Sequence, residues 1–187
     1  MHYLSKYFLF FCLLTSIFSC QLPIKPQTTV TKTTFFDLKN FLDQEVKHLN
    51  SSNIKVQKNI RYNKKTEEKV VQIDDWKKEL KVFYESDINK PSWSDKYTLD
   101  SSSIGDGLSL LHYKAIDQNL STQVLDIKLI GQKVHSILVV KKTSNQVYES
   151  QQYLTYIPGK SYTIKNTQDV ILFDKNDYLI EAKYIYS

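Results

Sequence analysis

The stretch VLDIKLIGQKVHSILVVKK, residues 124–142, decides the fold. Two aliphatic runs, 124–130 and 134–142, flank the dipeptide Gly131-Gln132. A two-residue connection containing Gly between such runs is typical of a tight β-hairpin. Both faces of the run 134–142 carry apolar residues, which favours an interior position in a sheet. The stretch therefore predicts an antiparallel sheet with this hairpin near its centre.

The alternation within residues 124–130 also predicts which side of the sheet is buried. Successive side chains of a strand point to opposite faces. Leu125, Ile127 and Leu129 should therefore face the core, and Asp126 and Lys128 should face outward.

Strand signals continue on both sides of this hairpin. Turn residues, including Gly105-Asp106-Gly107 and Pro158-Gly159, separate short runs rich in aliphatic and aromatic residues. The predicted strands are 97–99, 108–116, 147–157, 161–165, 170–173 and 178–185, and an upstream hairpin joins 54–60 to 71–73. Short strands joined by tight turns predict an antiparallel meander.

Two segments have the spacing of amphipathic helices instead. Residues 34–50 follow a capping-box-like start at Thr34 and Asp37, and then place apolar residues at helical spacing: Leu38, Phe41, Leu42, Val46 and Leu49. A second helix is predicted from Asp74 or Asp75 to residue 86, and Pro91 prevents its continuation. The predicted fold is therefore α+β: a large twisted antiparallel sheet of about eight or more strands with two helices packed on one face, in a single domain, 34–187.

The N-terminal segment predicts where the protein is located. Residues 1–7 contain basic residues and no acidic ones, and residues 8–17 are almost wholly apolar, which is long enough for a signal-peptide core but short for a membrane-spanning helix. The segment ends in Ile17-Phe18-Ser19-Cys20, which resembles the lipobox of bacterial lipoprotein precursors. That resemblance implies that residues 1–19 are removed as a signal peptide and that Cys20 is acylated and held by membrane lipid. An ordinary cleaved signal peptide and an uncleaved N-terminal helix are the alternatives.

The residues after Cys20 refine this prediction. In the lipoprotein family, Asp in the second mature position favours the inner membrane, so Gln21 favours the outer membrane, and residues 21–27 lack an acidic run that marks surface export in some Gram-negative groups. Residues 20–33, with two Pro and four Thr, are predicted to form an extended tether. The expected location is therefore the periplasmic face of the outer membrane. The remaining domain resembles the many uncharacterised envelope lipoproteins of Gram-negative bacteria. In size and element order it is loosely similar to the half-barrels of periplasmic lipoprotein carriers and receptors.

Composition excludes several functional classes. The formal net charge is +5, but the lysines are scattered and Arg61 is the single arginine, so nucleic-acid binding is not expected. Of the two cysteines, Cys12 lies in the predicted signal peptide, so neither an intrachain disulfide nor a cysteine metal site is expected. Common nucleotide-binding, zinc-protease and serine-hydrolase motifs are missing from the sequence. We therefore expect neither a metal nor an organic cofactor, and a catalytic function is the less favoured reading.

Two histidines leave an enzymatic alternative open. His112 is in phase with Leu108 and Leu110, and His135 is in phase with Ile137 and Val139. The two side chains could line one cavity, as general base or as zinc ligand, in a periplasmic hydrolase. The simpler interpretation is that each histidine packs within a strand and makes one hydrogen bond.

The aromatic residues suggest a binding site instead. The chain has 13 Tyr and 9 Phe, and many of the tyrosines lie in the last predicted strands. They either fill the core with their hydroxyls at its rim or wall a ligand site. Two short helices cannot cover the whole width of such a sheet, and the uncovered strip predicts a groove. The predicted function is a non-catalytic lipoprotein that binds an apolar or glycan ligand, or an envelope protein, in the sheet concavity, with four candidate ligand-binding residues: Trp76, Trp93, Tyr156 and Tyr184.

Overall fold

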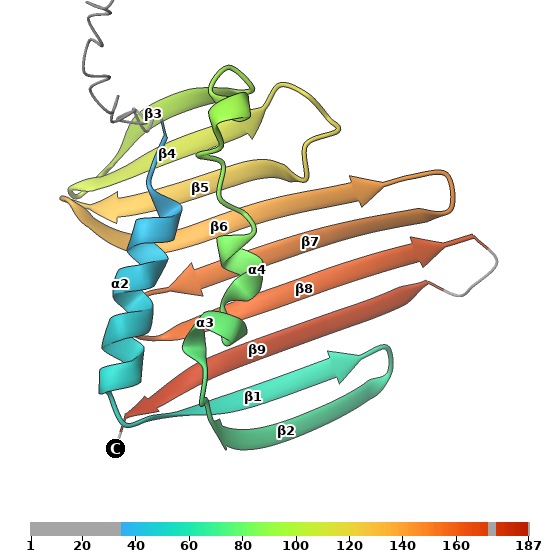
Figure 1. Cartoon of the computed structure of the whole chain (residues 1–187). Helices are drawn as coiled ribbons and strands as arrows, with labels where there is room; N and C mark the ends of the chain where they lie inside the picture. Colours follow the sequence, from blue (N-terminus) through green and yellow to red (C-terminus); the bar gives the residue numbers. More distant parts are fainter. Residues whose placement is uncertain (1–34, 172–174, 187) are drawn as a thin grey trace, which may run out of the picture. The chain divides into compact units, whose positions relative to one another are not determined.

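A computed structural model describes residues 35–171 and 175–186. In this part of the chain, nine strands form one antiparallel sheet in the order β2-β1-β9-β8-β7-β6-β5-β4-β3, with the helices on one face (Figure 1). The strands are β1 (Ile54–Tyr62), β2 (Lys65–Gln72), β3 (Tyr97–Gly105), β4 (Leu108–Ala115), β5 (Thr122–Ile130), β6 (Lys133–Ser144), β7 (Tyr148–Ile157), β8 (Ser161–Val170) and β9 (Asn176–Tyr186). The α+β prediction is confirmed.

The topology is a meander closed by the first hairpin. Strands β3 to β9 pair in sequence order, and β9 then pairs with β1, which brings the β1–β2 hairpin to the far edge. Between β5 and β6 the turn is Gly131-Gln132, and Gly131 has φ 60°, in the left-handed region that tight hairpins need. Strand β6 is interior as predicted, but only one of its faces is covered, because Ile137 and Val139 are fully buried while Leu138 is 38% exposed.

The first helix, α2 (Leu38–Ser51), begins later than predicted. Its N-cap is Asp37, whose carboxylate accepts a hydrogen bond from the Asn40 amide at 3.0 Å. The predicted first residue, Thr34, lies outside the described residues. The helix buries four of the five predicted apolar residues, while Phe41 stays half-buried: Leu38, Leu42, Val46 and Leu49.

The second predicted helix is two separate turns, α3 (Trp76–Glu79) and α4 (Lys81–Tyr84). The break falls at Leu80, whose backbone has φ −90° and ψ 11°. This change of direction buries Trp76, Leu80 and Phe83 together, with at most 2% of each exposed, so core packing overrides the continuous helical pattern. A 3-10 turn, Pro91–Trp93, follows before β3.

Both helical segments run across the strands rather than along them (Figure 1). At about 1.5 Å per residue, the 14 residues of α2 extend about 21 Å, which spans about four strands at a spacing of about 4.8 Å. About four of the nine strands is less than half of the sheet, so the structure agrees with the prediction that a helix of this length does not cover the whole sheet by crossing it. What stays uncovered on this face is the far end of the long strands, where β6 to β9 extend beyond α4 (Figure 1).

Strand β8 reaches into this uncovered end. The sequence predicts a turn at residues 166–169, but these residues continue β8 and pair with β7, from Gln152↔Asn166 to Glu149↔Asp169. These residues are polar because the helices do not cover this end of the strand, and not because the chain turns here.

Candidate functional site

The predicted ligand-binding aromatic residues lie mostly inside the core. Tyr156 is fully buried and Trp76 is 2% exposed. Trp76 packs edge-on against Tyr184 at a centroid distance of 5.3 Å, and Phe83 of α4 packs in the same way against Tyr156 at 5.7 Å. These rings form a layer between sheet and helices, so they dock the helices onto the sheet.

The tyrosine hydroxyls extend this docking contact. Tyr156 donates to Glu45 Oε2 of α2 at 2.7 Å, and Tyr162 donates to Glu79 of α3. Glu79 also accepts from Lys58 Nζ at 2.6 Å. Burial raises the pKa of both tyrosines, and the nearby carboxylates raise it further. Neutral phenols therefore fasten each helical segment to the sheet.

Tyr184 is held less completely. Its hydroxyl oxygen is buried, and within the described part of the chain it makes no hydrogen bond of normal geometry, although it is close enough to Tyr156 for each to influence the other's pKa. An apolar groove walled by Tyr156 and Tyr184 with Trp76 at its edge does not match this packing. Direct contact of these side chains with a ligand would require the helices to move, and that role stays a prediction.

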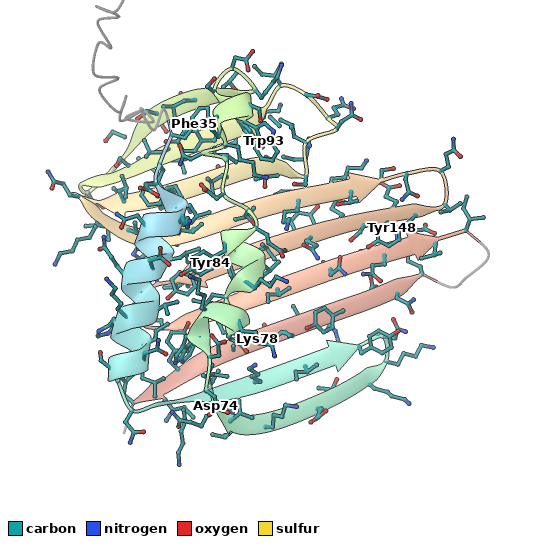
Figure 2. All side chains as sticks on the ribbon, in the orientation of Figure 1. Phe35, Asp74, Lys78, Tyr84, Trp93 and Tyr148 are labelled. Carbon is teal, nitrogen blue, oxygen red and sulfur yellow. The ribbon has the colours of Figure 1, made fainter. Side chains whose placement is uncertain are left out.

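Trp93, the fourth candidate, lies outside this layer. It is half-buried in the 3-10 turn, its ring is tilted against Tyr97 at 6.1 Å, and Lys90 Nζ lies 3.7 Å from its ring centroid. Figure 2 shows Trp93 close to β3 and β4, at the opposite end of the helical layer from Asp74. It is therefore not brought together with the other three.

On the helix-covered face, the strand register sorts the long strands into apolar and polar segments. Directly paired residues of antiparallel strands point to the same face, so each set of paired residues forms a row across the sheet. Two rows lie beneath the helices, and we call them the covered rows: Ile127, Ile137, Tyr156, Tyr162 and Ala182; and Leu125, Val139, Leu154, Ile164 and Ile180. All ten are buried except Ile164 and Ile180, which are half-buried.

The next two rows on the same face are polar. We call them the polar rows: Lys141, Gln152, Asn166 and Tyr178; and Thr143, Ser150, Gln168 and Asn176. Ser150 Oγ donates to Asn166 Oδ1 at 2.8 Å, and both residues are buried. This bond fixes the Asn166 carboxamide and leaves its N–H groups to donate. Apart from Lys141, the polar rows therefore consist of amide and hydroxyl side chains, of which Ser150 and Asn166 are buried and held by this bond.

A depression of about 240 Å³ lies at the boundary between α4 and the polar rows. Its lining comes from α4, from the loop before β5 and from β6 and β7: Val82, Glu85, Ser121, Lys141, Thr143, Tyr148, Ser150 and Gln152. Figure 2 shows Tyr148 near the far end of β7, beyond the edge of α4. The depression is thus open to solvent on one side and has a polar lining.

Lys141 is the cation that lines this depression. Its side chain is only 12% exposed, and its ammonium lies 3.9 Å from Glu85 Oε2, which is too long for a hydrogen bond. Burial lowers the pKa of Lys141, the charge of Glu85 opposes that shift, and the charge of Lys90 adds to it. Glu85 is 52% exposed, so this is a loose pair between a largely desolvated cation and a solvated anion.

The two predicted catalytic histidines do not meet. His112 lies on the open face of the sheet, where its Nδ1 is 2.6 Å from Asp126 Oδ1. His135 is exposed and falls where the β5–β6 register shifts, between Val134↔Leu129 and Ser136↔Lys128. That irregularity breaks the alternation that put His135 in phase with Ile137. The register therefore places the two histidines in no common row of paired residues.

Two further properties concern the whole described part of the chain. No group of three or more His, Cys, Asp or Glu side chains in residues 35–171 and 175–186 converges to hold a metal ion. Within the same residues, no helix is both long enough and apolar enough to cross a membrane. Cys20, the predicted lipidation site, lies outside the described residues.

Sequence reasoning missed the polar rows. A signal was present, because the apolar alternation of three strands stops part-way along: Val139 is followed by Lys141, Leu154 is preceded by Gln152, and Ile164 is followed by Asn166. Asn166 is predicted to lie in a turn, whereas Lys141 and Gln152 fall within predicted strands and were given no separate interpretation. Their alignment in one row appears only with the register.

Comparisons with known proteins add no assignment. The sequence matches no protein-family model, and neither the curated proteins nor the solved structures give a significant match. The class of protein is therefore defined by its fold and surface: an α+β sheet protein with a polar, partly enclosed surface beside its helical layer.

Proposed function

We propose that this protein is a non-catalytic lipoprotein of the bacterial envelope that binds a glycan on its polar rows. The observation that carries the proposal is the change of one continuous sheet face from apolar to polar at the edge of α4. A surface left open for an acyl chain would continue the apolar pattern of the covered rows. Amide and hydroxyl groups gathered on one surface suit the hydroxyls of a sugar.

Tyrosines and the buried hydrogen bond support a glycan in particular. Tyr148 and Tyr178 flank the amides on β7 and β9, and their rings offer flat apolar surface for the carbon face of a sugar. The Ser150–Asn166 bond orders the site without a ligand, which lowers the entropic cost of binding.

The binding test uses two adjacent glutamines. The full chain, purified in detergent micelles, is applied to a glycan array and then titrated with the glycans retained. Gln152→Ala should weaken binding about fivefold or more, because it removes an amide from the polar rows. Gln151→Ala is the matched control, since Gln151 is exposed on the opposite face. Equal effects of the two substitutions, or no saturable binding of any glycan, would contradict the proposal.

The proposed location in the cell envelope rests on the lipobox at Ile17-Phe18-Ser19-Cys20. Cys20→Ala should abolish incorporation of labelled palmitate and release the protein from the outer-membrane fraction of a Gram-negative host. Unchanged label or unchanged fractionation would remove the lipid anchor, and with it the membrane partner, from the proposal.

A periplasmic hydrolase is the second candidate, and the His112–Asp126 pair favours it. Donation from Nδ1–H to the carboxylate leaves Nε2 as the basic nitrogen, which is the arrangement of an oriented general base. A panel of ester and glycoside substrates decides between the two functions. Turnover that is lost in His112→Gln but kept in His135→Gln would establish the hydrolase.

A further inference from the structure

The strongest unassigned feature of the molecule is the Lys141 ammonium. Only 12% of this side chain is exposed, and a desolvated ammonium with no close partner is unfavourable. Within the described residues its one ion pair is the 3.9 Å contact with Glu85, whose own side chain is 52% exposed. A structural salt bridge at this depth would instead have a close, hydrogen-bonded carboxylate, as Lys58 has in Glu79 at 2.6 Å.

Apart from Glu85, the residues that line the depression with Lys141 are uncharged, and Lys90, whose charge acts on Lys141, is not among them. Hydroxyls of Ser121, Thr143 and Tyr148 and the amide of Gln152 line the same depression. At about 30 Å³ for each water molecule, its volume of about 240 Å³ corresponds to about eight waters, which is room for one small ring. The site therefore offers one positive charge surrounded by donors and acceptors for neutral groups.

We propose that the glycan bound on the polar rows carries a carboxylate, and that this carboxylate binds Lys141 in place of Glu85. The proposal rests on the glycan-binding function above and names its ligand class as an acidic sugar such as a hexuronate. Lys141 is the one cation among the lining residues, which matches a monoanion, and Glu85 would keep its 3.6 Å pair with Lys81 after the exchange. A phosphate dianion would need more than one cation and would be repelled more strongly by Glu85.

If the ligand carboxylate replaces Glu85 as the partner of Lys141, the two charges should have opposite effects on ligand affinity. Lys141 attracts the ligand carboxylate, whereas Glu85 competes with it for the same ammonium. Removing the two charges should therefore change affinity in opposite directions. If the Lys141–Glu85 contact served stability alone, neither substitution would change ligand affinity.

The test titrates the full chain in detergent micelles by calorimetry with sodium glucuronate, its neutral amide glucuronamide, methyl glucoside, glucose 6-phosphate and acetate. Glucuronate should bind about tenfold or more tighter than glucuronamide, because a charged hydrogen bond is replaced by a neutral one. Lys141→Gln should erase that preference, and Glu85→Gln should tighten glucuronate binding. Lys142→Gln is the matched control, since Lys142 lies on the opposite face and pairs with Glu149 at 3.0 Å.

Each of the other outcomes contradicts one part of the proposal. Equal binding of glucuronate, glucuronamide and methyl glucoside would overturn the carboxylate inference and leave glycan binding intact. Tighter binding of glucose 6-phosphate would overturn the monoanion assignment, and acetate binding as tightly as glucuronate would overturn the sugar. Binding of none of the sugars would contradict the proposed function as well. If Lys141→Gln fails to fold, Glu85→Gln still decides, because weakened or unchanged glucuronate binding in that variant contradicts the exchange of partners.

Discussion

The two halves of the helix-covered sheet face are built from the same strands but have opposite chemistry. Beneath the helices, β6, β7 and β8 contribute Ile137, Tyr156 and Tyr162, which are at most 1% exposed. Two rows further along the same face, these strands contribute Lys141, Gln152 and Asn166. Each of these strands is therefore apolar where the helices cover it and polar where they do not.

The contrast also separates stability from binding. Apolar burial is worth about 25 cal/mol per Å², so the covered rows contribute more to the folding free energy than the polar rows do. A buried polar group contributes little net stability, and it costs stability when it lacks a partner. Retaining polar groups at the end of the sheet is therefore easier to explain by binding than by folding. Four changes test this division, from the largest expected effect to the smallest.

Alkaline pH should weaken the covered half most. Burial raises the pKa of Tyr156, Tyr162 and Tyr184, so these phenols stay protonated in the folded chain above their ordinary pKa of about 10. The unfolded chain then binds fewer protons. Through these three groups, the free energy of unfolding should fall above about pH 10 by about 1.4 kcal/mol per pH unit for each tyrosine, or about 4 kcal/mol per pH unit for all three. Urea unfolding over this range checks the slope. A flat profile would mean that these hydroxyls are solvated.

A truncation in each half compares them at neutral pH. Leu154→Ala should lower the free energy of unfolding by about 2–5 kcal/mol, because Leu154 is fully buried and the substitution leaves a cavity. Gln152→Ala, two residues away on the same face, should cost about 1 kcal/mol or less. Urea denaturation measures both. Similar losses at the two positions would show that the polar rows belong to the core.

Loss of one docking hydroxyl should have an intermediate effect. Tyr156→Phe keeps the ring but leaves Glu45 without its donor, which should cost about 1–3 kcal/mol. Tyr153→Phe is the control, since Tyr153 is 42% exposed. Tyr156→Phe should also reduce the fall of the free energy of unfolding above about pH 10 by the contribution of one tyrosine. An unchanged midpoint and slope in Tyr156→Phe would remove the hydroxyl from the account of helix docking.

Removal of the buried charge should have the smallest effect on stability. Lys141→Met should change the free energy of unfolding by about 1 kcal/mol or less, or raise it, because a desolvated ammonium with only a 3.9 Å ion pair is exchanged for an apolar chain. Thermal unfolding of this variant beside the wild type provides the measurement. A loss as large as that of Leu154→Ala would make Lys141 a structural residue.

The sheet and its central hairpin could be predicted from the sequence because their signals are local. Gly131-Gln132 lies between two apolar runs, and the alternation placed Leu125 and Ile127 correctly in the core. Leu129 is only half-buried, because it lies beside the register shift that also displaces His135. Such an irregularity depends on both strands and is invisible in either one alone.

The parts that could not be predicted depend on what packs over each strand. Helical spacing predicted one helix from residue 74 or 75 to residue 86, yet burying Trp76 and Phe83 together broke it at Leu80. Residues 166–169 were read as a turn because they are polar, although they continue β8 beyond the helices. The candidate site was missed for the same reason, since its residues come from four strands, β6 to β9, and align only through the register.

The most direct test of the account maps a bound ligand onto the two faces of the sheet. The full chain in detergent micelles is titrated with the tightest glycan from the array while backbone amide resonances are followed by NMR. We expect shifts confined to the polar rows and the adjoining edge of α4, including Lys141, Gln152 and Asn166. Shifts centred on His112 and Asp126 of the open face, or shifts beneath the helices at Tyr156, would contradict the division of the sheet into a covered core and a polar binding surface.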